Sequence, residues 1–220
     1  MNSSRARRVS ATKLSSTQVE NLTILALARG HEVFRCHSRF HTNDSGRRSE
    51  QGSWFFASSA GRFDLSAPRG TLNVAAGRIG AVCESLGVLT LDEEIPIQEL
   101  AARKLVALAL PEDVALVDFT DRKAAQASRI LAAEMSGAAE DYRDFQSLAA
   151  SVDAAGMNGI CSRLRFSGPE NENGCFIFGE AGPRNWPAGK VLDLMEEVMA
   201  LGYSIVDDEG LPVSEVNFQK

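Results

Sequence analysis

A charged residue stands inside each of two apolar segments, Val33-Phe34-Arg35-Cys36-His37 and Ala81-Val82-Cys83-Glu84-Ser85-Leu86-Gly87. A guanidinium or a carboxylate in such a setting must be solvated by something other than bulk water. Charges of this kind are typical of pockets in which a bound ligand uses them. The two segments therefore predict a binding or catalytic site that contains Arg35 and Glu84. The structural alternative is a partly buried ion pair between the two side chains, without a catalytic role.

The periodicity of these segments predicts one strand and one helix. Alternation over residues 33–37 is typical of a strand, in which Arg35 shares a face with Val33 and His37. From about Arg78 the apolar residues recur at helical spacing until Gly87 ends the pattern. This places Glu84 at the edge of the buried stripe of the helix.

Strands and helices mix along the rest of the chain without strict alternation. This order favours an α+β fold over a doubly wound parallel sheet, and predicts a single domain whose mixed β-sheet is flanked by helices. The domain is expected over residues 17–207, between a basic, Ser-rich tail at 1–16 and a C-terminal tail at 208–220. The predicted strands include 70–75, 104–110, 114–120, 159–166 and 175–178, and the predicted helices include 17–28, 121–136, 142–156 and 191–201.

Composition excludes several classes of function. The net charge of -6 over 220 residues argues against a dedicated nucleic-acid binder, since neutralising phosphates needs a surplus of Lys and Arg. No apolar run reaches the length of a membrane span. The four cysteines form no CxxC pair, which indicates small core residues in a reducing cytoplasm, and we expect no metal site. Neither GxGxxG nor GxxxxGK[ST] occurs, so any nucleotide must be held in another way.

Further motifs follow the first segment in a fixed order: Gly61-Arg62-Phe63-Asp64-Leu65-Ser66-Ala67-Pro68, then 70–75, 81–87, 114–120, 159–166 and 178–182. Read in this order, residues 31 to 186 resemble the RES-domain family, whose members look like ADP-ribosyltransferases in fold and degrade NAD. The resemblance implies an enzyme that cleaves the nicotinamide–ribose bond, as a glycohydrolase or a phosphorylase. NAD is then the substrate, and no cofactor is expected. Members are often toxins silenced by a helix-turn-helix antitoxin, which adds such a protein as an expected partner.

The family's catalytic arginine and glutamate fall on Arg35 and Glu84. Nicotinamide departs as a neutral molecule and needs little acid help, whereas the ribose becomes oxocarbenium-like as the bond lengthens. A carboxylate close to the sugar stabilises that charge, which is the role implied for Glu84. The pyrophosphate needs a bidentate cation, which Arg35 would supply with help from Arg62 or Arg165.

Two positions depart from the family pattern. Asn73 stands where the family has a tyrosine, and Leu164 stands where a gapless count places its serine. Asn73 still offers hydrogen bonds to a ligand, and Ser162, two residues before Leu164 on the same strand face, would replace the serine after a small register shift. The alternatives are therefore a catalytically weakened module that binds a nucleotide or a protein partner, or an ADP-ribosyltransferase.

Overall fold

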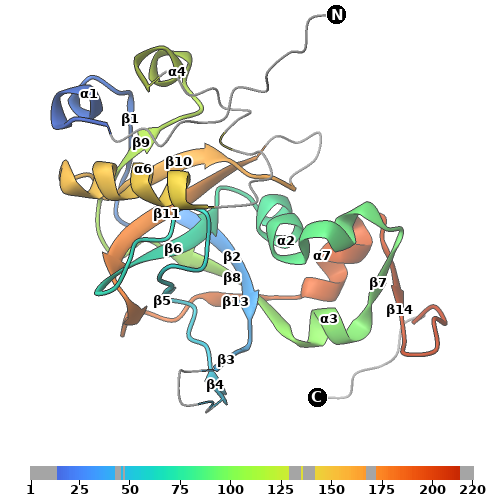
Figure 1. The fold of residues 1–220 in the computed structure, drawn as a ribbon. Coiled ribbons are helices and arrows are strands. Elements are labelled where there is room, and N and C mark those ends of the chain that lie inside the picture. Colours follow the sequence, from blue (N-terminus) through green and yellow to red (C-terminus); the bar gives the residue numbers. More distant parts are fainter. Residues whose placement is uncertain are drawn as a thin grey trace, which may run out of the picture.

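One mixed eight-stranded sheet forms the centre of the computed structural model, which describes residues 14–42, 46, 48–128, 135, 142–166 and 172–213 (Figure 1). The strand order is β1-β9-β10-β11-β6-β2-β8-β13. β9 and β10 run parallel, and the other neighbours run antiparallel. The strands are β1 (Ile24–Leu27), β2 (Glu32–Ser38), β6 (Arg69–Ala75), β8 (Arg103–Ala109), β9 (Val114–Asp118), β10 (Gly159–Arg163), β11 (Asn173–Glu180) and β13 (Lys190–Leu192).

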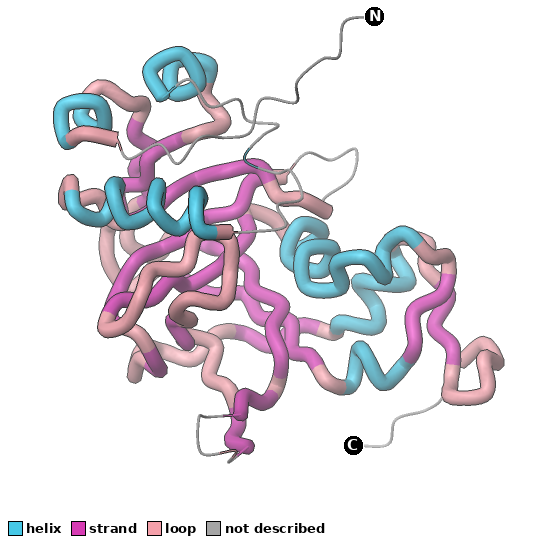
Figure 2. The backbone as a smooth tube through the Cα atoms, in the orientation of Figure 1, coloured by secondary structure: helices cyan, strands magenta, loops and turns pink. Residues whose placement is uncertain are grey.

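The helices supply buried side chains to a single core on one face of the sheet, and Figure 2 shows how they are distributed around the strands. Phe145 and Leu148 of α6 and Val82 and Leu86 of α2 meet sheet residues such as Phe176 in this core. The helices are α1 (Ser16–Glu20), α2 (Arg78–Leu86), α3 (Ile97–Ala101), α4 (Arg122–Ser128), α6 (Arg143–Ala154) and α7 (Leu194–Ala200), with a 3-10 turn η1 (Gly87–Leu91) after α2.

The opposite face of the sheet encloses a second core without helices. Leu116 of β9 and Leu108 of β8 share this core although they lie far apart in the strand order, so the sheet curves around it. Trp54 and Phe56 cover it, and the indole of Trp54 donates to the carbonyl of Pro187 at 2.7 Å. Short two-stranded sheets flank the body: β3 (Phe40–Thr42) with β4 (Arg48–Glu50), β5 (Phe55–Phe56) with β12 (Gly182–Pro183), and β7 (Glu94–Pro96) with β14 (Ser204–Val206).

The large sheet opens in its middle, between β2 and β6. In the described chain these strands share one residue pair, Phe34 with Ala75, whereas β2 pairs with β8 along its whole length. β6 likewise pairs fully with β11 on its other side. The inner edges of β2 and β6 therefore diverge from this one pair, and α2 packs on both strands across the gap.

The predicted α+β class, with a mixed sheet flanked by helices, is confirmed. The helix over 78–86 is also confirmed, and Cys83, Cys161 and Cys175 are buried in the core as the sequence predicts. Among the described residues, none of the helices has the length and apolarity that a membrane crossing requires.

Two predicted helices are wrong in part. The helix expected over 17–28 ends at Glu20, and Ile24–Leu27 instead forms β1 against β9. The capping box of α1 is formed by Ser15 and Gln18, since the Ser15 side chain accepts from the Gln18 amide. The helix expected over 191–201 starts only after Asp193, whose carboxylate caps α7, and the preceding Lys190–Leu192 is the edge strand β13.

Segments assigned to the tails also carry ordered contacts. Leu14 is buried in the helix-side core, and the amide of Val213 donates to the carbonyl of Ile205 at 2.8 Å. Contacts with the body of the fold thus reach residue 14 at one end and residue 213 at the other. Residues 1–13 and 214–220 of the predicted tails lie outside the described residues.

Candidate active site

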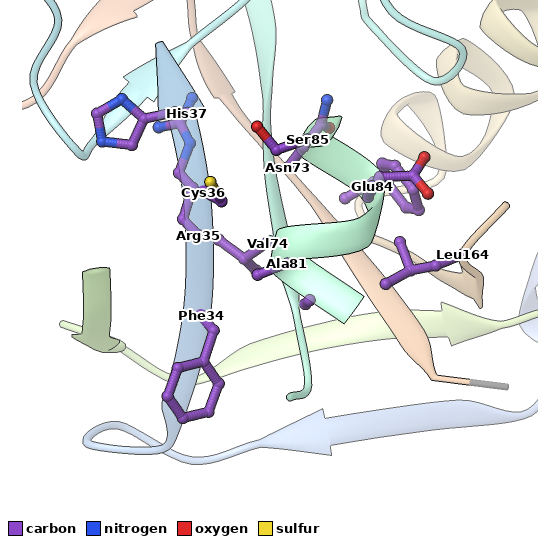
Figure 3. A pocket seen from close by; sticks show the side chains of 12 residues that line it. Phe34, Arg35, Cys36, His37, Asn73, Val74, Ala81, Glu84, Ser85 and Leu164 are labelled. Atoms are coloured by element: carbon purple, nitrogen blue, oxygen red, sulfur yellow. The ribbon is translucent and has the colours of Figure 1, made fainter. Parts of the chain in front are cut away.

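A pocket of about 210 Å³ lies where β2 and β6 diverge, beneath α2 (Figure 3). Both charged residues singled out from the sequence contribute to its lining. So do Asn73 and Leu164, the two positions that depart from the family pattern. The complete lining is Phe34, Arg35, Cys36, His37, Asn73, Val74, Ala75, Ala81, Glu84, Ser85, Leu164 and Phe176.

Glu84 is held through one carboxylate oxygen. Its Oε2 accepts from the backbone amides of Arg165 at 2.9 Å and Phe166 at 3.4 Å. Within the described chain, no group forms a hydrogen bond with Oε1. The carboxylate is therefore fixed in orientation while its second oxygen stays available to a ligand, which suits a group that stabilises positive charge.

Helix α2 presents Glu84 because both of its ends are fixed. The N-cap residue is Gly77, which has no capping side chain, and the carboxylate of Glu172 instead accepts from the amide of Gly80 at 2.7 Å. This carboxylate satisfies one of the free amides of the first turn and opposes the positive end of the helix dipole. At the other end, Gly87 adopts a φ of +59°, a backbone conformation that glycine tolerates best.

Arg35 does not form an ion pair with Glu84 within the described chain. Its side chain leaves β2 on the face of Val33, opposite Phe34 and Cys36, which pack on the helix side. The guanidinium donates to the carbonyls of Ser53 and, at 3.1 Å, Phe55. Arg35 is only 7% exposed, and this burial lowers its pKa to about 10 against the opposing influence of Asp64. The alternative of a direct Arg35–Glu84 ion pair is wrong.

Arg62 is the arginine whose charge lies in the field of Glu84. Burial lowers its pKa, whereas the charges of Glu84 and then Tyr142 raise it. Its guanidinium lies over the ring of Phe176, with 5.7 Å between the guanidinium carbon and the ring centroid, and donates to the carbonyl of Met135 at 2.5 Å. Arg62 thus adds positive potential behind the pocket wall that Phe176 forms.

Tyr142 lies near Arg62, although it does not line the pocket. It is half-buried against the helix-side core, close enough to Arg62 to affect its pKa. It lies immediately before α6, far from Arg62 in the chain, and no local motif marks it. Only the packing of α6 against the sheet brings the tyrosine to this region.

The remaining predicted residues fall at different depths. Asn73 is exposed on the helix side of β6, opposite Phe176 of β11. Leu164 is 7% exposed and fills the space beside Gly80 and Gly174, where it forms an apolar wall.

Ser162 is fully buried and does not line the pocket, and its hydroxyl donates to the Arg163 carbonyl at 3.4 Å. Arg165 lies at the site through its backbone amide, while its guanidinium stacks on Phe166 at 4.8 Å.

His37 occupies the face of β2 that carries Arg35. Its Nδ1 lies 2.7 Å from the carbonyl of Ser38, so Nδ1 carries the proton, and Nε2 is buried without a partner in the described structure. Burial lowers the pKa of His37 to about 4, and the charge of Arg35 acts in the same direction. The imidazole is therefore neutral at pH 7. Elsewhere in the described chain too, no group of three or more His, Cys, Asp and Glu side chains is arranged to hold a metal ion.

We expect the stability of the protein to fall as the pH drops from 6.5 towards 4. In the unfolded chain His37 takes up a proton near its ordinary pKa of 6.5, whereas the folded chain resists protonation down to about 4. Between pH 7 and pH 5 this difference amounts to a loss on the order of 1–2 kcal/mol. Urea unfolding of the parent and of His37→Asn, whose amide can still donate to Ser38, measures it.

The variant should show a smaller loss between pH 7 and pH 5 than the parent. The comparison isolates His37 from Asp64, whose pKa is raised by burial and whose contribution therefore has the opposite sign. Identical pH dependence in the two proteins would mean that His37 is not the group that titrates.

Comparison with known proteins gives a likeness of fold. No family model matches the chain, and no curated protein sequence matches it. Among solved structures, the chain is similar to a chain of the crystal structure of the M. tuberculosis MbcT–MbcA toxin–antitoxin complex, with a TM-score of 0.57 and 13% sequence identity. The alignment covers 87% of this chain and 100% of that chain. This protein therefore has a fold that also occurs in a toxin–antitoxin complex.

Proposed function

We propose that the protein degrades NAD by cleaving its nicotinamide–ribose bond, as an ADP-ribosyltransferase-like glycohydrolase or phosphorylase of RES type. The observation that carries this proposal is Glu84, with one oxygen fixed by two backbone amides and the other free in a pocket at the split of the sheet. The order of motifs from residue 31 to 186 supports the same reaction. The likeness to a chain of a toxin–antitoxin complex supports a role as a toxin with a protein antitoxin as partner.

The pocket suits one end of the substrate. Its volume of about 210 Å³ lies below the range of roughly 300–1,000 Å³ usual for sites that enclose whole ligands. We infer that it receives nicotinamide and the adjoining ribose, and that the adenylate half lies outside. The inner edges of β2 and β6, which pair with each other only at Phe34 and Ala75, offer backbone groups to the carboxamide.

In the reaction, the bond between the ribose C1′ and the pyridinium nitrogen breaks, and its electron pair leaves with neutral nicotinamide. Oε1 of Glu84 stabilises the positive charge that develops on the ribose and orients the incoming acceptor. Water then gives ADP-ribose and a proton, whereas inorganic phosphate gives its 1′-phosphate. Arg62, behind Phe176, adds a positive potential that favours the anionic pyrophosphate.

Release of nicotinamide tests the proposal. The purified, folded protein is incubated with NAD in buffer with and without inorganic phosphate, and the products are separated by chromatography. A hydrolase should release nicotinamide in both buffers. A phosphorylase should release it only in the buffer that contains phosphate. No release above the protein-free control in either buffer would contradict the proposal.

A second candidate is a weakened relative that binds a nucleotide or a partner without turnover. Leu164 favours this candidate, because an apolar wall replaces the hydroxyl that the family pattern places there. NAD binding measured by calorimetry without nicotinamide release would select it. Transfer of labelled ADP-ribose to a macromolecule in the same assay would instead select an ADP-ribosyltransferase.

A further inference from the structure

A second and larger cavity, of about 610 Å³, lies at the edge of the sheet where β13 ends. It is enclosed by α3, the first residues of β8, the end of β13 and the start of α7. Its lining shares no residue with that of the candidate active site. The volume falls within the range of about 300–1,000 Å³ usual for small-molecule sites.

Eight of the fourteen residues that line this edge cavity are apolar. Leu100 and Leu105 are almost completely buried beneath it, whereas Val191 is 60% exposed at its margin. Leu192, Leu194 and Met195 continue the apolar surface from β13 into α7. A hydrocarbon chain placed here would remove this apolar surface from water, which is the main source of affinity in such sites.

The charged groups at the cavity other than Arg39 each have an ion-pair or hydrogen-bond partner. Arg103 forms an ion pair with Glu99, and Lys104 lies 2.9 Å from a carboxylate oxygen of Glu50. On the acidic side, Asp193 caps α7 and Asp208 accepts from the side chain of Gln98. The two cations of this group are therefore already paired with carboxylates.

Arg39 is the exception. Its backbone amide donates to the carbonyl of Ala102 and its Nε to the carbonyl of Arg103, both at 2.8 Å, which fixes the side chain beside the cavity. In the described chain its two terminal nitrogens have no hydrogen-bond partner. The hydrogen bond and the charge of Lys104 lower the pKa of the nearby Glu50, and the charge of Arg39 makes a smaller contribution in the same direction. A guanidinium in this state matches a carboxylate through two parallel hydrogen bonds.

We propose that the edge cavity binds a small amphipathic carboxylate, with its alkyl chain against the apolar walls and its carboxylate on Arg39. The site is independent of the proposed NAD chemistry, because the two linings are separate. Ligand binding therefore tests the edge cavity without any measurement of NAD turnover.

Binding of an alkyl carboxylate series to the full chain tests the proposal. Hexanoate, octanoate and decanoate, each below its critical micelle concentration, are titrated by calorimetry and followed by ligand-observed NMR. Each added methylene should tighten Kd about fourfold while the cavity has room for it. Octanamide and octyltrimethylammonium, which carry a neutral and a cationic head, should bind at least tenfold more weakly than octanoate.

Two variants test whether the ligand binds in the edge cavity. Ala101 is an exposed residue of the lining, so Ala101→Phe fills the space without removing a core side chain, and should weaken decanoate binding at least tenfold. Arg39→Gln should weaken it about tenfold and remove the preference for the carboxylate over the amide. The matched controls are Ala102→Phe, at the next position but outside the lining, and Arg29→Gln, at an exposed turn; both should bind as the parent does.

Three results would overturn the proposal. Equal binding by Ala101→Phe and Ala102→Phe would show that the ligand lies elsewhere. If Arg39→Gln still preferred the carboxylate to the amide, the guanidinium would not be the group that binds the carboxylate. Displacement of decanoate by NAD would show that the edge cavity belongs to the dinucleotide site.

Discussion

Glu84→Gln is expected to lower the kcat of nicotinamide release by about 10²-fold or more, with little change in KM. The amide oxygen can still accept from the backbone amides of Arg165 and Phe166, so the side chain keeps its position. What it loses is the negative charge that, in the proposed reaction, stabilises the oxocarbenium-like ribose. Because that charge develops only in the transition state, the loss appears in kcat.

Steady-state kinetics of the purified variant, with thermal unfolding measured beside it, provide the check. Glu93→Gln is the matched control, since this exposed glutamate lies outside the pocket lining and should leave kcat unchanged. Expression of the parent in a bacterial host should deplete NAD and arrest growth, whereas Glu84→Gln should not. A fully active Glu84→Gln protein would remove Glu84 from the chemical step.

Arg35→Met is expected to reduce the free energy of unfolding by about 2–4 kcal/mol. The carbonyls of Ser53 and Phe55 lose a charged donor and stay partly buried without a replacement. Removing the buried charge itself returns some of its desolvation cost, which keeps the loss below the sum of two charged hydrogen bonds. For a domain of this size the melting temperature should fall by about 10 °C.

Thermal and urea unfolding measure this loss, and Arg29→Met, at an exposed turn, serves as the control with no expected change. The measurement also separates two roles of Arg35. An unchanged melting temperature together with a raised KM for NAD would mean that the guanidinium holds the pyrophosphate, as the family resemblance implies. A lowered melting temperature with normal KM in the folded protein would assign Arg35 to the attachment of the 53–55 segment.

The parts of the fold that the sequence predicted correctly are those whose burial follows a local period. The helix over 78–86 has an apolar stripe at helical spacing and a glycine at its end, so its limits were readable from the chain. Ile24–Leu27 lacks such a local cause, because pairing with β9, almost a hundred residues away, makes it a strand. The start of α7 carried a usable signal in Asp193, an N-cap residue that separates a strand from a helix.

In the candidate site too, some positions follow from local spacing in the sequence and others depend on tertiary packing. The position of Glu84 at the edge of a helical stripe followed from its spacing, and the structure places it on the pocket. The neighbourhood of Glu84, Arg62 and Tyr142 depends on how α2, the 61–64 turn and α6 pack together, which no local pattern encodes. Strand alternation did indicate that Arg35 faces away from Phe34 and Cys36, but not which face the helix would cover.

The single residue pair between β2 and β6 divides the large sheet into two blocks. Within each block the strands are joined along their length, whereas the blocks are held together by Phe34–Ala75, by the packing of α2 and by the two cores that both blocks share. Since the strands leave this gap open, the side-chain volume beneath α2, at positions such as Ala81, sets how much room the pocket offers a ligand, and a change of helix packing alters that room while the strands remain as they are.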